Sequence, residues 1–164
     1  SHTTEYLIGQ IDAGAEAVQL FDSWSGSLPS GEFDEWVIAP TRRIVDAIRS
    51  ARPGVPIIGF PKGAGEKLPR YAEQTGVDAI GLDETLDPVW ADSVLPKGLP
   101  VQGNLDPMLL LAGGERLDAA VIRILDALQA RPHVFNLGHG IDRFTPIAHV
   151  EQALATLRNW QRRA

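Results

Sequence analysis

The sequence predicts an α/β protein, a parallel (β/α) barrel of the TIM type in which about five of the eight strands are present. Two observations favour this fold class. Short continuous apolar runs, typical of strands buried on both faces, alternate with segments whose apolar residues recur every three to four positions, as on one side of a helix. Polar residues and glycines follow these runs directly, where parallel strands of such folds carry their functional sites.

Five short apolar runs are expected to form the strands. The first and third share a pattern, because Gly14 and Gly76 precede them and an aspartate ends each run. A glycine at this place can end the preceding helix in the left-handed conformation. The expected strands are residues 17–22 (AVQLFD), 56–60 (PIIGF), 78–83 (DAIGLD), 100–104 (PVQGN) and 133–138 (HVFNLG).

Helices are expected between the strands and after the last one, each with an apolar stripe that can cover a sheet. Pro40 interrupts the first stripe. Because proline suits the first turn of a helix but not its interior, that helix should begin near Pro40 or bend there. The three stripes are Val37, Ile44 and Ile48; Leu117, Val121, Ile124 and Leu128; and Ile147, Val150, Leu154 and Leu157.

Strict alternation of strands and helices fits a doubly wound sheet or a closed barrel. The barrel is favoured because no G-x-G-x-x-G or G-x-x-x-x-G-K-S/T nucleotide motif follows a strand. A complete barrel takes about 250 residues, and helical periodicity is already present at Tyr6, Leu7, Ile8 and Ile11. We therefore expect residues 1–164 to be a single domain, the carboxyl-terminal portion of a barrel whose amino-terminal part is absent.

The composition argues against several classes of protein. The chain has no cysteine, so disulfides and thiolate ligation of zinc or iron–sulfur clusters within it are excluded. Its net charge of −6 argues against binding to nucleic acid or to an anionic membrane surface. There is no apolar run of membrane-spanning length and no signal-peptide pattern at the start. A cytoplasmic location is expected.

The strongest candidate for a catalytic residue is His139. It lies between two glycines directly after the last expected strand, which places its imidazole at the mouth of the predicted cavity, and histidine titrates near neutral pH. It could supply a proton or donate a hydrogen bond to an anion. The alternative is a histidine that bonds only to the loop backbone. His133 and His149 are expected to be surface residues.

Candidate binding residues follow the first and fourth strands. Ser23 offers a hydroxyl to a polar ligand and Phe21 an apolar wall, whereas Asp22 could equally cap a turn that Ser23 begins. No G-x-S-x-G motif surrounds Ser23, which disfavours covalent acyl chemistry. Asn104 lies in a Gly-Asn-Leu-Asp-Pro turn that could bind a ligand, or could be structural, with Asp106 capping a helix that starts at a proline.

Taken together and in this order, these runs resemble the uroporphyrinogen decarboxylase family. The matching segments are Q-L-F-D-S-W-S-G (19–26), G-L-D (81–83), V-Q-G-N-L-D-P (101–107) and F-N-L-G-H-G-I (135–141), followed by T-P (145–146). The segments Q-G-N-L-D-P and N-L-G-H-G are specific, whereas G-L-D alone is weak. The resemblance runs from about residue 5 to the end and covers roughly the carboxyl-terminal half of the family's chain.

The resemblance implies a distorted (β/α)8 barrel, usually a homodimer, that removes carbon dioxide from the four acetate side chains of uroporphyrinogen, a tetrapyrrole, without a metal or organic cofactor. By this resemblance Ser23 and His139 line the substrate cleft and Phe21 forms its wall. The family's pyrrole-binding aspartate, arginine-bearing loop and active-site tyrosine have no counterparts here. Two alternatives stay open: an inactive fragment that could pair with itself to complete a barrel, and a related corrinoid methyltransferase, which the absence of cysteine disfavours.

Overall fold

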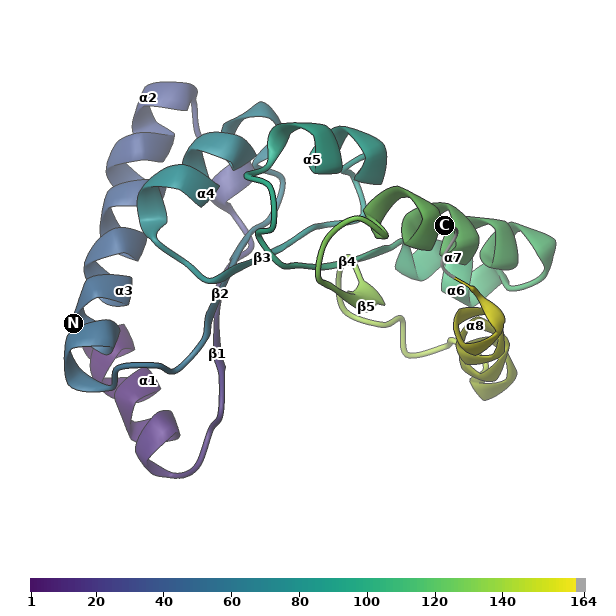
Figure 1. The fold of residues 1–164 in the computed structure, drawn as a ribbon, viewed down its shortest axis with the longest axis horizontal. Helices are drawn as coiled ribbons and strands as arrows, with labels where there is room; N and C mark the ends of the chain where they lie inside the picture. Colours follow the sequence, from purple (N-terminus) through teal and green to yellow (C-terminus); the bar gives the residue numbers. More distant parts are fainter. Residues whose placement is uncertain (162–164) are drawn as a thin grey trace. The chain divides into compact units, whose positions relative to one another are not determined.

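The computed structural model describes residues 1–161, which divide into two compact units between Gly81 and Leu82. Five strands follow one another in the order β1-β2-β3-β4-β5, and helices separate them along the chain (Figure 1). The strand pairs β1–β2 and β2–β3 of the first unit and β4–β5 of the second are all parallel. The predicted parallel α/β class is confirmed, and all five expected strands are present. The assignment of residues 1–164 to a single domain stays a prediction.

The first unit contains three strands, and its main helices lie on one side of β1 and β2 (Figure 1). A left-handed glycine, Gly76 with φ +75°, ends the helix before β3 as expected, and Gly14, with φ +109°, precedes β1. The elements are α1 (His2–Asp12), β1 (Val18–Asp22), η1 (Ser25–Ser27), α2 (Ser30–Phe33), η2 (Asp34–Ile38), α3 (Ala39–Ala51), β2 (Ile57–Pro61), η3 (Gly65–Lys67), α4 (Leu68–Thr75) and β3 (Ala79–Gly81).

Helix α3 begins at Ala39, so Pro40 lies in its first turn as predicted, although helical backbone already precedes it. Helical backbone runs from Ser30 through η2, a π-helical turn, into α3, whose first residues are Ala39 and Pro40. A proline cannot donate the hydrogen bond to the carbonyl four residues earlier, and its ring crowds that carbonyl. The wider π turn directly before Pro40 is the irregularity by which the helix accommodates this residue.

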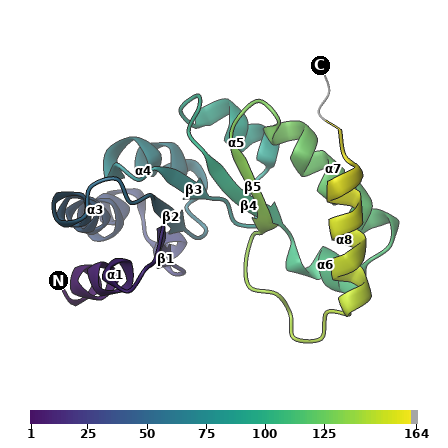
Figure 2. The same cartoon turned by 60° about the horizontal axis from the view of Figure 1, so that its bottom comes forward.

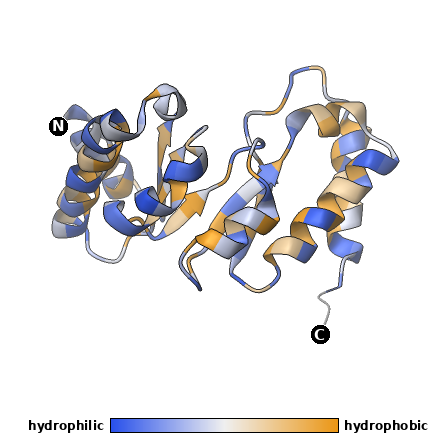
Figure 3. Ribbon diagram, turned by 90° about the horizontal axis from the view of Figure 1, so that it is seen from above, coloured by the Kyte–Doolittle hydropathy of each residue, from blue (hydrophilic) through white to orange (hydrophobic). Residues whose placement is uncertain are grey.

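Gly59 shows which face of the sheet in the first unit the helices cover. A Cβ on Gly59 would lie 2.7 Å from the ring of Tyr71 on α4, so Gly59 is on the face that the helices cover. Alternation along β2 then puts Phe60 on the opposite face, where the register Phe21↔Phe60 also places Phe21. Phe21 is 71% exposed on that face. In Figure 3 the strands are mostly hydrophobic in colour, while the helices carry hydrophobic and hydrophilic stripes.

The second unit pairs β4 and β5 in the register Val101↔His133 to Leu105↔Leu137. The predicted apolar stripe of α7 is confirmed, because Leu117, Val121, Ile124 and Leu128 are all buried. Asp106 caps α6 before Pro107 as expected, with Oδ1 accepting from the Met108 amide at 2.8 Å. The elements are α5 (Pro88–Val94), β4 (Val101–Leu105), α6 (Pro107–Ala112), α7 (Glu115–Leu128), β5 (His133–Leu137) and α8 (Ile147–Asn159).

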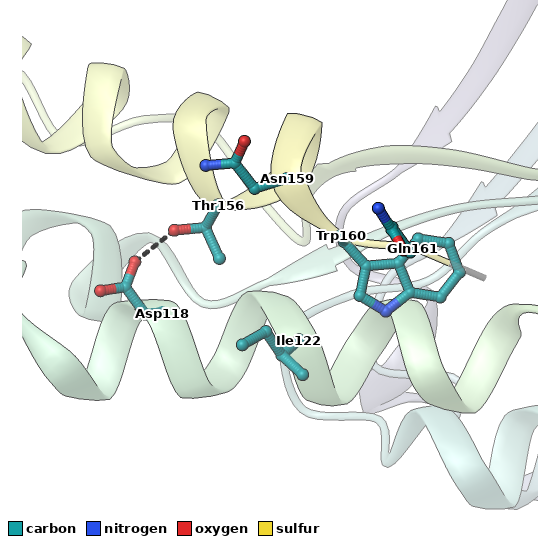
Figure 4. A pocket seen from close by; sticks show the side chains of 6 residues that line it. All are labelled: Asp118, Ile122, Thr156, Asn159, Trp160 and Gln161. Carbon is teal, nitrogen blue, oxygen red and sulfur yellow. Dashed lines mark hydrogen bonds between the residues drawn. The ribbon is translucent and has the colours of Figure 1, made fainter. Parts of the chain in front are cut away.

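Helix α8 differs from the sequence-based expectation. Its apolar stripe was predicted to cover a sheet, but Ile147 is 77% exposed and only Ala153 of this helix is buried. Helix α8 instead lies along α6 and α7 (Figure 2). Polar side chains of α8 and of the residue after it hydrogen-bond to α7 and to the turn before α7; Figure 4 shows Thr156 bonded to Asp118.

Candidate functional site

In the first unit, the loop after β1 carries Ser23 and Trp24 on its surface. Asp22 accepts a hydrogen bond from the Trp24 amide at 3.3 Å, so it forms the turn that the sequence suggested. Ser23 is exposed and makes no hydrogen bond within residues 1–161. Its hydroxyl is therefore available to a ligand, and the turn that Asp22 caps is what presents it.

Phe21 and Asp22 are adjacent in the sequence but lie on opposite faces of β1. Phe21 is on the face away from α4, where its ring meets that of Phe60 edge to face at 5.7 Å between centroids. Asp22 is on the face that the helices cover, where burial raises the pKa of Tyr71 and the charge of Asp22 adds a smaller rise. Of these two residues, Phe21 is the one placed to contact a ligand on the open face.

Sequence reasoning missed Ser25, which is 1% exposed and donates toward the carbonyl oxygens of both Asp22 and Lys62. The run S-W-S-G-S contains three serines at two-residue spacing, Ser23, Ser25 and Ser27, of which only Ser23 is a predicted binding residue. The glycine after Ser25 is the signal that could have found it, because a glycine beside a small polar residue is typical of a loop that packs closely on another backbone.

In the second unit, Asn104 holds the loop after β3. The side chain is buried, and its Nδ2 donates to the carbonyl oxygens of Asp83 at 3.2 Å and Leu86 at 2.7 Å. Its Oδ1 has no hydrogen-bond partner among the described residues. Asn104 thus has a structural role. Its contact with a ligand stays a prediction, and Oδ1 is the atom that could accept a hydrogen bond from that ligand.

The loops after β3, β4 and β5 meet at Gly138. Its amide donates to the carbonyl oxygen of Leu105 at 2.8 Å, and a Cβ on Gly138 would overlap the backbone of Asp83 and Glu84. The glycine is therefore required for the close approach of two loops. The loops that follow β3, β4 and β5 come together within the second unit, where a parallel α/β fold is expected to carry its site.

His139 follows this close contact directly. Its side chain is exposed and, in the part of the chain that the structure describes, takes part in no hydrogen bond. The alternative in which His139 only bonds to the loop backbone is not what the structure shows. The close packing of Gly138 fixes the backbone before His139, and the exposed imidazole can contact a ligand.

Two further histidines, His133 and His149, correct the expectation that they lie at the surface. His133 is half-buried, with Nε2 2.7 Å from the carbonyl oxygen of Gly103, and burial lowers its pKa while that hydrogen bond opposes the shift. His149 is also half-buried, with Nδ1 3.1 and 3.0 Å from the carbonyl oxygens of Leu110 and Leu111 at the end of α6. Both act as structural hydrogen-bonding groups, a role that their positions in the sequence do not reveal.

Residues 1–161 contain neither a cluster of metal ligands nor a membrane-spanning helix. Histidine, aspartate and glutamate side chains do not gather there in any group of three or more that could hold a metal ion. The helices there also include none with the length and apolar character needed to cross a membrane.

Comparisons with known proteins match this chain along nearly its whole length. The family model described as uroporphyrinogen decarboxylase matches residues 1–160. The uroporphyrinogen decarboxylase of Erythrobacter litoralis is 65% identical over 160 residues, which are 98% of this chain and 47% of the relative. That of Rhodospirillum rubrum is 51% identical over 158 residues, 96% of this chain and 45% of the relative. The chain belongs to the uroporphyrinogen decarboxylase family.

This chain spans about half the length of the family members that it matches. Among solved structures, a methyltransferase from Methanosarcina mazei is similar with a TM-score of 0.75 at 17% identity, covering 90% of this chain and 43% of that one. Such a likeness concerns the fold alone. Together with membership of the uroporphyrinogen decarboxylase family, it supports the assignment of the fold to the TIM-barrel type.

Proposed function

We propose that the full-length protein containing this chain is a cytoplasmic uroporphyrinogen decarboxylase. It would convert uroporphyrinogen to coproporphyrinogen in porphyrin biosynthesis by removing carbon dioxide from four acetate side chains. The observation that carries this proposal is the match to the uroporphyrinogen decarboxylase family over residues 1–160. In support, the loops that bear Ser23 and His139 each follow the carboxyl end of a parallel strand.

The proposed reaction uses the substrate as its own electron sink. Protonation of an electron-rich pyrrole carbon makes the ring cationic. The bond between the acetate methylene and its carboxylate then breaks, its electron pair neutralises the ring, and carbon dioxide leaves. A proton added to the resulting exocyclic methylene forms the methyl group, and loss of the first proton restores the aromatic ring. The enzyme must therefore supply protons and stabilise a cation, and no cofactor is required.

We assign the catalytic role to His139, because its imidazole is exposed and makes no hydrogen bond within the described residues. It would donate a proton to the substrate or hold one of its carboxylates. Ser23 would donate or accept a hydrogen bond, and Phe21 would form an apolar wall. Asp22 and Asn104 complete the proposed substrate-binding set. Asp22 caps the turn that presents Ser23, and Asn104 supports the loop after β3.

The remainder of the protein has to supply what this chain lacks. The substrate carries eight carboxylates, whereas this chain has a net charge of −6. Arginines outside residues 1–164 would balance the substrate's charge. A homodimer is the proposed assembly. The corrinoid methyltransferase alternative is disfavoured because such enzymes activate a thiol on zinc held by histidine and cysteine, and this chain has no cysteine.

The proposal is tested by assaying uroporphyrinogen conversion with the full-length protein and with residues 1–164 alone. We expect turnover by the full-length protein and none by the isolated chain, because the groups that bind the pyrroles and carboxylates lie outside it. His139→Asn in the full-length protein should lower kcat/KM by about 100-fold. The control is His2→Asn, since His2 is fully exposed on α1. Absence of turnover by the full-length protein would overturn the assignment.

A further inference from the structure

The loop that carries Ser23 is tied to the ends of two strands by Ser25. The Ser25 hydroxyl is buried, and its Oγ lies 3.1 Å from the carbonyl oxygen of Asp22 and 3.0 Å from that of Lys62. Asp22 ends β1, and Lys62 directly follows the last residue of β2. A single hydroxyl proton is thus shared between the two strand ends, and the loop cannot move away from either one without losing this bond.

The backbone after Ser25 is fixed as well. The amide of Gly26 donates to the carbonyl oxygen of Lys62 at 3.0 Å, and a Cβ on Gly26 would come within 2.6 Å of the carbonyl carbon of Gly63. The two backbones pack so closely that only glycine fits. Lys67 then donates from Nζ to the carbonyl oxygens of Gly26 at 3.2 Å and Leu28 at 2.9 Å.

Lys67 is itself held in place. Its Nζ lies 5.1 Å from the centroid of the buried Phe33 ring, a cation–π arrangement that restricts the side chain. A lysine that donates to two loop carbonyls in this way acts as an internal brace. Its charge is used within the protein to order backbone.

The other side chains of the loop point outward. Trp24 is 82% exposed, and Ser23 is exposed without a hydrogen-bond partner in residues 1–161. Ser27 differs from Ser25, because among the described residues its hydroxyl bonds only to the Trp24 carbonyl within the same turn, at 2.7 Å. The loop therefore has a fixed base, formed by Ser25, Gly26 and Lys67, and an exposed tip at Ser23 and Trp24.

We propose that Ser25, supported by Lys67, is a positioning residue that fixes the Ser23 hydroxyl for contact with the substrate. This inference rests on the proposed function, in which Ser23 touches the substrate and Ser25 does not. Displacing a substrate-contacting group by about 1 Å can lower the rate by up to about 100-fold. A buried hydroxyl that joins two strand ends beside Ser23 is placed to prevent such a displacement.

The test is a double-mutant cycle in the full-length protein. Ser25→Ala should lower kcat/KM for uroporphyrinogen about tenfold, and Ser27→Ala, the matched control in the same loop, should leave it within about twofold. In the Ser23→Ala background, Ser25→Ala should have almost no further effect, because the group that Ser25 positions is gone. Additive effects of the two substitutions would show that Ser25 does not act through Ser23 and would overturn the proposal.

Hydrogen exchange of the Gly26 and Trp24 amides supplies a readout that does not depend on activity. Ser25→Ala should accelerate exchange at these amides, and Lys67→Met should do the same, while Lys67→Arg should restore slow exchange. Lys67→Met also serves if Ser25→Ala fails to fold. Unchanged exchange in these variants would refute the positioning role, even if the wild-type protein decarboxylates uroporphyrinogen. Conversely, suppose that these variants show accelerated exchange but the wild-type protein has no decarboxylase activity. Ser25 and Lys67 would then still be the residues that order the loop, and only the proposed function would be refuted.

Discussion

Tyr71 shows how one residue of the core depends on another. Its side chain is fully buried in the first unit, and burial raises its pKa to about 12, although a hydrogen bond with Thr41 partly opposes the shift. The ring lies against the backbone of Gly59 in the middle of β2. A glycine in the interior of a strand is usually unfavourable, and here it makes room for an aromatic ring.

Gly59→Ala is therefore expected to destabilise the protein by about 1–3 kcal/mol, since the new Cβ would lie 2.7 Å from the Tyr71 ring and the core would have to shift. Urea unfolding of the full-length protein measures the change. Gly9→Ala on α1 is the matched control, because a Cβ there meets open space. This control should raise the free energy of unfolding by about 0.5–1 kcal/mol. Equal effects of the two substitutions would contradict the packing argument.

Individual residues were predictable where a sequence position implies a place in the fold. His139 and Ser23 follow strands, and both are exposed at the loops where they were expected. Ser25 and His149 were not recognised, because their roles depend on carbonyl groups of other segments, Lys62 for one and the end of α6 for the other. Hydrogen bonds to distant backbone leave no periodic pattern in a sequence.

At the scale of elements, the strands were predictable and the packing of α8 was not. Each strand is an apolar run, and β2, β3 and β4 are largely buried as such runs predict, whereas β1 and β5 carry exposed apolar side chains. On α8 the apolar residues at positions 147, 150, 154 and 157 suggested the packed side of the helix. The packed side in fact carries His149, Gln152, Thr156 and Trp160, all of which hydrogen-bond to the α6–α7 region.

Asp118 on α7 is the centre of this polar contact. It accepts from Gln152 at 2.8 Å and from the Thr156 hydroxyl. Asp118→Ala should destabilise the docking of α8 by about 2 kcal/mol, because hydrogen bonds to a partly buried carboxylate are lost. Hydrogen exchange along α8 would detect the loosening as faster exchange confined to this helix. Glu151→Ala, an exposed position on α8, should leave exchange unchanged. Global rather than local acceleration would argue that α8 is not held separately.

At the scale of the whole molecule, both units carry strands with exposed apolar residues. Phe21 on β1 and Val134 on β5 are large hydrophobic side chains, and Val134 is 59% exposed. Parallel sheets of α/β proteins are normally buried on both faces. In the proposed full-length protein, residues outside this chain are the expected cover for these side chains, because the chain spans about half the length of its relatives.

Val134→Thr distinguishes a covered position from an exposed one. In the isolated chain the substitution should change the free energy of unfolding by less than about 0.5 kcal/mol, as at most surface positions. In the full-length protein it should destabilise by about 1–2 kcal/mol, because a hydroxyl would be buried where a methyl group packed. Ile122→Thr is the matched control, since Ile122 is an exposed β-branched residue on α7 and should respond equally in both proteins. Urea unfolding of the four variants gives the comparison, and an equal effect of Val134→Thr in the two proteins would mean that the rest of the chain does not cover β5.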